Sequence, residues 1–184
     1  MAHEAHIRTG GYTLVELMVT LAVLAVTLTI GVPAFAGVIQ RAREANAYHL
    51  LTASLAAARI AAVKDGTAVS VCPSPDGARC RGDAVWEGGW IVYSDPGDEG
   101  QPRDARAVLQ HVEGIGPGLA LRSTSGRTRV RFTPDGWSYG RNLSVRLCGL
   151  EGSRLLGKVV VNNAGRPRSE RSEAGQPCPY DPGA

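Results

Sequence analysis

The feature that most constrains this 184-residue chain is an uncharged apolar run near its N-terminus. From Leu17 to Gln40, 24 consecutive positions carry no charged side chain. At about 1.5 Å per residue, a helix of this length crosses a hydrocarbon core of about 30 Å. A secretory signal peptide has a shorter run with a small-residue cleavage site after it, and a domain this small cannot surround a helix that is apolar on every face. The run therefore predicts one membrane-spanning helix.

Three features distinguish this helix from a simple membrane anchor. A hydrophilic leader, residues 1–11, precedes it and ends in Gly10-Gly11. Glu16 stands at the edge of the apolar run, where an ionised carboxylate is costly and usually functional. Pro33 interrupts an otherwise helical pattern, which predicts a kink or local unwinding.

The segment GYTLVE, residues 11–16, resembles the processing site of type IV pilins and type II secretion pseudopilins. In that family a membrane peptidase cuts after the Gly and N-methylates the new first residue, which is usually Phe and here is Tyr12. Counted from Tyr12, Glu16 is the fifth residue and Pro33 the twenty-second, where the family has Glu and many members have Pro. The resemblance implies that a prepilin peptidase processes the chain at Gly11 and Tyr12.

The same resemblance implies how the N-terminal part works. Residues 12–39 would form the transmembrane half of the helix and later the core of a filament. The free N-terminal amine of a neighbouring pilin or pseudopilin would neutralise Glu16 and set the axial step between subunits. Pro33 is the second residue assigned to assembly. The family's orientation implies a single-pass protein of the bacterial inner membrane with a periplasmic globular domain.

Beyond Pro33 the helical pattern continues but becomes amphipathic. Apolar positions recur every three or four residues through Leu50, Ile60 and Val63, which we expect to face the core. A continuous helix from Thr13 to Lys64 would be roughly 78 Å long and would end at Gly66.

The rest of the chain indicates β-structure. Short alternating or β-branched runs are separated by Gly, Pro and Asp clusters, which is typical of strands joined by turns. The predicted strands are Thr67–Cys72, Trp90–Ser94, Ala107–Val112, Leu119–Arg122, Thr128–Thr133, Leu143–Leu147 and Lys158–Asn162. We therefore expect an α+β, pilin-like fold, with the long helix packed on an antiparallel β-sheet or sandwich over residues 40–164. Residues 165–184 are expected to form an irregular tail.

The globular part resembles the GspH/FimT branch of the pilin superfamily. The motifs are VCPS at 71–74, DG at 76–77, Cys80, Trp86, GWIVY at 89–93, Asp95, FTPDG at 132–136, Leu147-Cys148 and GRPR at 165–168. This resemblance implies a minor pilin of the tip or priming complex of a type IV pilus. The alternative is pseudopilin H of a type II secretion system, and the N-terminal chemistry does not separate the two machines.

Cys72, Cys80, Cys148 and Cys178 form an even set that permits three disulfide connectivities. The spacing argues against a zinc site or a redox pair, because no two cysteines are two to four residues apart. An extracytoplasmic location favours disulfides. We favour Cys72–Cys80, closing a Pro/Gly-rich loop, and Cys148–Cys178, tying the tail to a strand.

Charge is unevenly distributed although the net charge is only +3. Lys64–Leu119 has five basic and nine acidic residues, whereas Ala120–Arg171 has eleven basic and three acidic residues, a net charge of +8. Such a field attracts polyanions, and Arg binds phosphate bidentately. The alternative interpretation is that these arginines are ordinary solvated residues on strand faces.

GRPR at 165–168 also matches the GRxR motif that FimT-type minor pilins use to hold DNA, so double-stranded DNA is a hypothetical partner. Contacts would be to phosphates and independent of sequence. The candidate residues are Gly165, Arg166, Arg168, Arg171, Lys158 and Arg146.

The sequence predicts no enzyme, no cofactor and no metal site. It has only four His, and no serine lies in a nucleophile-elbow pattern. The acidic loop Asp95–Asp104 lacks the ligand spacing of an EF-hand.

Overall fold

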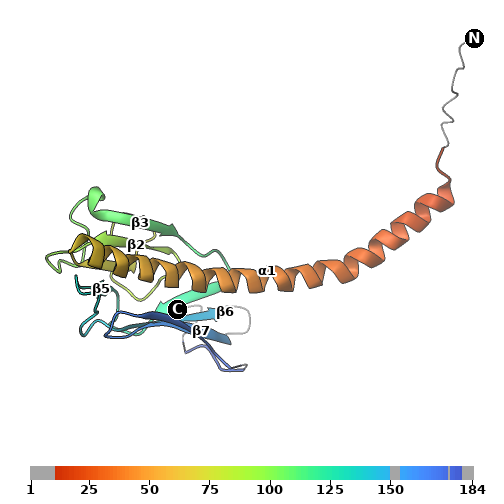
Figure 1. The fold of residues 1–184 in the computed structure, drawn as a ribbon. Helices are drawn as coiled ribbons and strands as arrows, with labels where there is room; N and C mark the ends of the chain where they lie inside the picture. The colour runs from red at the N-terminus through yellow and green to blue at the C-terminus, as the bar shows by residue number, and fades with distance from the viewer. Residues whose placement is uncertain (1–10, 150–153, 174, 180–184) are drawn as a thin grey trace, which may run out of the picture. The chain divides into compact units, whose positions relative to one another are not determined.

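A computed structural model describes residues 11–149, 154–173 and 175–179 (Figure 1). The chain divides into two compact units, residues 1–42 and 43–184, which are described separately. Helix α1 (Leu14–Asp65) contributes to both and matches the predicted helix within one residue at each end. It is continuous through Pro33, so the local unwinding expected there does not occur. Gly66 follows the helix at φ +61°, a left-handed conformation that favours glycine as a helix stop.

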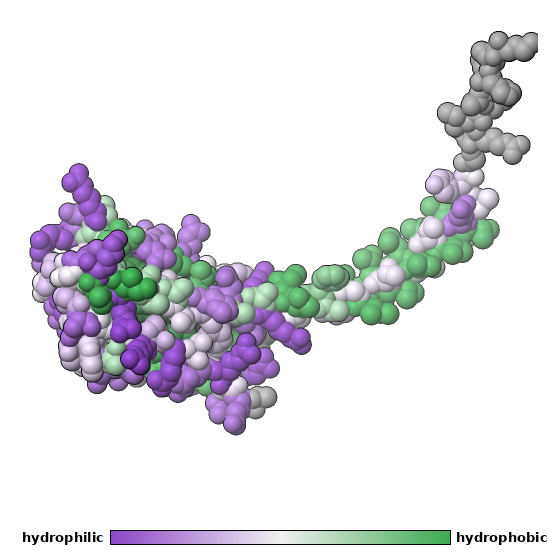
Figure 2. All heavy atoms as spheres, in the orientation of Figure 1, coloured by the Kyte–Doolittle hydropathy of each residue, from purple (hydrophilic) through white to green (hydrophobic). Residues whose placement is uncertain are grey.

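The first unit exposes apolar side chains on all sides. From Leu14 to Ile39, its large hydrophobic side chains are 52–75% exposed (Figure 2). Helix α1 is long and apolar enough to cross a membrane. Its threonines bond their hydroxyls back to the helix, and Thr27 donates to the carbonyl oxygens of Val23 and Leu24 at 3.0 and 2.9 Å. These polar groups are therefore satisfied without water, as a hydrocarbon environment requires.

The second unit contains two four-stranded antiparallel sheets. One has the order β3-β2-β1-β5 and the other β4-β6-β7-β8. The strands are β1 (Val69–Pro73), β2 (Gly89–Ser94), β3 (Val108–Glu113), β4 (Leu119–Ser123), β5 (Val130–Phe132), β6 (Leu143–Gly149), β7 (Arg154–Val161) and β8 (Pro167–Arg171). All seven predicted strands are present, with shifted ends. The α+β architecture is as expected.

Strand β8 corrects the expectation of an irregular tail from Gly165 onward. It pairs antiparallel with β7, placing Arg168 opposite Val160 and Glu170 opposite Lys158. This edge strand has the sequence PRSER, which is polar and begins with proline, so it carries no hydrophobic alternation that would have predicted a strand.

The core lies between both sheets and the part of α1 that belongs to the second unit. The buried helix face consists of Ala47, Leu51, Leu55, Ala58 and Ala62. The predicted face was wrong, since Ile60 and Val63 are 65% and 53% exposed. The helix is apolar at so many positions that periodicity did not identify the correct face. Small alanines there let the sheets approach the helix closely.

Both favoured disulfides are present, Cys72–Cys80 and Cys148–Cys178. The first covers a smaller cluster of Cys72, Ile91 and Tyr93 that is separate from the main core. Gln101 joins two surface loops there, because its side-chain amide accepts from the Cys80 backbone N–H and donates to the Cys80 carbonyl, at 2.9 and 3.0 Å.

Candidate functional site

The N-terminal candidate residues lie at the start of α1. Tyr12 is 88% exposed, and Thr13 caps the helix by accepting a 3.2 Å hydrogen bond from the Glu16 backbone N–H. Glu16 therefore lies in the first turn, where a negative charge interacts favourably with the helix dipole. This cap was not predicted, although Thr followed by Glu three residues later is a known helix-start signature.

The Glu16 carboxylate has no hydrogen-bond donor or ion-pair partner among the described residues. Pro33 lies several turns further along α1, so the structure does not bring Glu16 and Pro33 together. Any group that neutralises the carboxylate must therefore come from outside the described chain.

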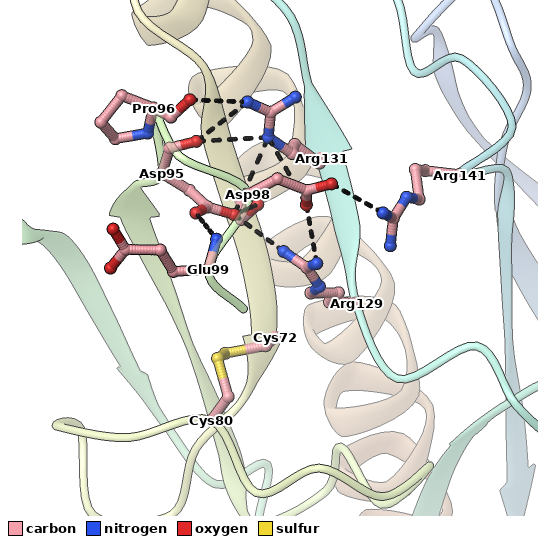
Figure 3. A network of polar contacts seen from close by, with 10 residues as sticks. Cys72, Cys80, Asp95, Pro96, Asp98, Glu99, Arg129, Arg131 and Arg141 are labelled. Atoms are coloured by element: carbon pink, nitrogen blue, oxygen red, sulfur yellow. Dashed lines mark hydrogen bonds and ion pairs between the residues drawn. A yellow bond between two sulfur atoms is a disulfide. The ribbon is translucent and has the colours of Figure 1, made fainter. Parts of the chain in front are cut away.

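The acidic loop after β2 forms the main polar network of the second unit (Figure 3). Asp95 is only 2% exposed, and its carboxylate accepts from the Ser70 hydroxyl at 2.7 Å, from Arg129 at 2.8 Å and from the Glu99 backbone N–H at 2.8 Å. Arg131 donates to the backbone carbonyl oxygens of Asp95 and Pro96. The buried charge is thus paired and hydrogen-bonded within the chain.

Asp98 extends this network to Arg141, in the segment between β5 and β6. Its carboxylate accepts from Arg129 at 2.7 Å and from Arg141 at 2.8 Å (Figure 3). Desolvation acts to raise the pKa of Asp98, but the hydrogen bond and charge of Arg129 and the charge of Arg141 hold it below its usual value. Burial likewise raises the pKa of the neighbouring Tyr93 phenol.

These contacts change the interpretation of the arginines between Ala120 and Arg171. Arg129, Arg131 and Arg141 bind the acidic loop, and Arg122 pairs with Glu87. The acidic segment Lys64–Leu119 and the basic segment Ala120–Arg171 therefore neutralise one another in part. The net charge of +8 in the basic segment is not all available at the surface to attract a polyanion.

The structure gathers three of the DNA-binding candidates around one hollow. Arg146, Lys158 and Arg171 line it, with a volume of about 330 Å³, together with Glu170 and Glu173. Lys158 pairs with Glu170 at 3.0 Å. The hollow is therefore of mixed charge.

The GRPR motif is divided by the fold. Gly165 is buried in the turn before β8 at φ +67°, and a side chain there would collide with the carbonyl oxygen of Gly136. Arg168 is exposed but pairs with Glu170 at 2.7 Å. Arg166 is exposed, and its guanidinium has no acceptor within the described ranges. Arg166 is thus the member of the motif best placed to bind a ligand.

Two aromatic residues on the surface escaped the sequence analysis. Trp137 and Tyr139 lie in the turn between β5 and β6, and their rings stack with centroids 5.4 Å apart. The only signal was their spacing in TPDGWSYG, which indicated a turn and nothing more. No group of three or more His, Cys, Asp or Glu in the part of the chain that the structure describes could hold a metal ion.

Comparison with protein families gives two matches. Residues 47–165 match the family described as Type II transport protein GspH, and residues 8–32 match the prokaryotic N-terminal methylation motif. No curated protein sequence matches this chain.

Comparison with solved structures supports the fold. The type IV minor pilin FimU of Pseudomonas aeruginosa is similar, with a TM-score of 0.58 and 23% identity, covering 76% of this chain and 97% of that one. A second crystal form of FimU has a TM-score of 0.55 and 23% identity, and the match covers 72% of this chain and 98% of that one. The minor pseudopilin EpsH of the Vibrio cholerae type 2 secretion system has a TM-score of 0.46 and 13% identity, and the match covers 68% of this chain and 94% of that one.

Proposed function

Because this chain belongs to the GspH family of pilin and pseudopilin subunits, which are structural proteins and not enzymes, we propose that it is a minor pilin of a type IV pilus. In this proposal, prepilin peptidase removes residues 1–11, and residues 12–39 anchor the protein in the inner membrane. The globular domain lies in the periplasm, where disulfides persist. The mature protein then joins the tip or priming complex of the filament.

The observation that carries this proposal is the carboxylate of Glu16, which has no partner among the described residues. It stands directly before the uncharged stretch of α1, residues 17–40, whose large apolar side chains are exposed. An ionised carboxylate is costly in hydrocarbon unless a cation neutralises it. The N-terminal amine of an adjacent subunit supplies that cation in the assembled filament.

The test is Glu16→Ala, with Glu113→Ala as the matched control on the exposed face of strand β3. We expect Glu16→Ala to abolish recovery of the protein in sheared filaments, while Glu113→Ala enters them normally. The amount of membrane-bound protein should be the same for both variants. Normal incorporation of Glu16→Ala would contradict the proposal.

The alternative is that the filament is the pseudopilus of a type II secretion system, which the name of the matched family favours. Deleting the gene separates the two. Loss of surface pili with normal secretion supports the pilus, and the reverse result supports the secretion system.

DNA binding is a second candidate function, favoured by Arg166, whose side chain is exposed and whose guanidinium has no acceptor among the residues that the structure describes. Since Arg168 already pairs with Glu170, we expect Arg166→Gln to weaken duplex binding more than Arg168→Gln. The double variant should bind all sequences less tightly. The slope of the logarithm of the binding constant against the logarithm of the salt concentration should become shallower by about 0.9 for each phosphate that the protein no longer binds.

Mobility shifts of the full chain in detergent measure this. Arg103→Gln is the control, because Arg103 is an exposed arginine paired with Glu99 in the acidic loop. Absence of a shift with the unmodified chain at low salt would exclude DNA binding.

A further inference from the structure

Trp137 and Tyr139 form a small aromatic platform on the surface of the second unit. Their side chains are 44% and 58% exposed, and the two rings are nearly parallel, with an interplanar angle of 10°. The core of the unit buries its other two tryptophans, Trp86 and Trp90, completely. A stacked pair left in solvent offers a flat apolar surface to which a further ring can add.

The platform is held in place by its own turn. Asp135 accepts hydrogen bonds from the Tyr139 hydroxyl at 2.6 Å, from the Trp137 backbone N–H at 3.2 Å and from the Thr133 hydroxyl. The bonds from Thr133 and Tyr139 lower the pKa of Asp135, so its carboxylate remains ionised and keeps these contacts. Rings that are already fixed lose little conformational entropy when a ligand binds.

Two arginines belong to segments that contact the aromatic turn. The guanidinium of Arg127 donates to the carbonyl of Gly140, the residue after Tyr139, at 2.8 Å, and its side chain is exposed. In addition, Ser138 donates its backbone N–H to the carbonyl of Asn163 at 2.8 Å. This bond places the aromatic turn directly against the turn that leads into Arg166.

We propose that the platform of Trp137 and Tyr139, with Arg127 and Arg166 beside it, binds single-stranded nucleic acid. An unpaired base stacks on the aromatic pair, and the two arginines bind the adjoining phosphates. A duplex keeps its base faces stacked inside the helix and cannot use the aromatic surface, so single strands bind in preference. This inference rests on the proposed DNA-binding role and adds the residues and the strand form to it.

Tryptophan fluorescence provides a direct test on the full chain in detergent. Because Trp86 and Trp90 are buried, quenching by an added oligonucleotide reports on Trp137. The probe is an oligothymidine of about 20 nucleotides, longer than a typical single-strand site of about 4–16 nucleotides. We expect it to quench the fluorescence, whereas a duplex of equal length does not.

Affinity measurements with variants complete the test. Trp137→Ala should weaken oligothymidine binding by about five-fold or more, as expected when one base no longer stacks, and leave duplex binding unchanged. Trp137→Phe should retain most of the affinity because it keeps a ring. Leu109→Ala, which removes an exposed apolar side chain from strand β3, should have no effect.

Three outcomes overturn the proposal. Unchanged oligothymidine affinity in Trp137→Ala, with duplex binding that still depends on Arg166, leaves the proposed DNA binding intact and refutes the platform. If neither form of DNA binds, both ideas fail. If Trp137→Ala alters only incorporation into filaments, the aromatic pair is a contact between subunits and not a nucleic-acid site.

Discussion

Glu16 and Asp95 show how differently the two units of this protein treat a carboxylate. Asp95 is nearly inaccessible, and the second unit surrounds it with three hydrogen-bond donors, one of them a guanidinium. Glu16 lies directly before the uncharged stretch of α1, and its carboxylate receives no donor from the described chain, although the helix dipole favours its charge. The second unit therefore pairs its buried carboxylate internally, whereas the first leaves Glu16 without a partner among the described residues.

The comparison extends to the rest of each unit. Both disulfides and the main hydrophobic core belong to residues 43–184, while the large apolar side chains of the first unit are exposed. We infer that substitutions in the second unit affect folding and that substitutions in the first affect assembly.

Asp95→Ala should have the largest effect on folding. It leaves the buried Ser70 hydroxyl without its acceptor and Arg129 with only Asp98. We expect the free energy of unfolding of the second unit to fall by about 3 kcal/mol, the lower end for a broken buried pair. Denaturant unfolding followed by fluorescence of the buried tryptophans measures this. For Glu16→Ala, this free energy of unfolding should stay within about 0.5 kcal/mol of the value for the unmodified chain. An equal fall in the free energy of unfolding of both variants would contradict the comparison.

Two glycines allow a matched test of packing. Gly165→Ala places a side chain on a residue in the left-handed backbone conformation and against Gly136. The free energy of unfolding of the second unit should therefore fall by about 1–3 kcal/mol. Gly31→Ala meets no atom within 4 Å and improves helix propensity. Fluorescence-detected unfolding should therefore be unchanged for Gly31→Ala, and its helical circular dichroism should not decrease. Destabilisation of the second unit by Gly31→Ala would show that the two units are not independent in this respect.

Acid should have the smallest and most gradual effect. The folded-state pKa of Asp98 lies below its unfolded value, so its contribution to stability is full above about pH 5. That contribution is lost as the pH falls through the unfolded and then the folded pKa. Asp98→Asn should therefore make the loss of stability between about pH 5 and 3 shallower. Asp65→Asn, at an exposed position with no ion pair in the described ranges, is the control and should leave the acid profile unchanged.

Local signals were sufficient for most secondary structure. The length of the helix, its end at Gly66 and the positions of seven strands follow from hydrophobic pattern and turn residues, which act within a few positions. The buried face of α1 did not follow, because an alanine-rich helix offers several faces of similar hydrophobicity. Strand β8 was missed because its five residues, PRSER, include no β-branched or aromatic side chain that would have indicated a strand.

The candidate site was predicted less completely than the fold. The GRPR motif and the basic segment were visible, but the partners of their arginines were not. Glu170 neutralises Lys158 only because β8 pairs with β7 in one register, and it reaches Arg168, two residues away, because both lie on the same extended strand. The proximity of the Trp137 turn to Gly165 likewise depends on a contact between residues far apart in the chain.

The sequence by itself determined the uncharged stretch at residues 17–40, the motif before it and the position of Glu16 at its edge, because each depends only on a contiguous stretch of residues. Only the tertiary structure decided which arginines pair with carboxylates of the same chain. Ion pairing falls off steeply with distance, and the fold, not the order of residues, sets the distances between Asp98 and Arg141 or between Trp137 and Arg166. For this protein, the apolar N-terminal stretch can therefore be recognised from the order of residues alone. Which charged side chains stay available to a ligand depends on how the domain folds.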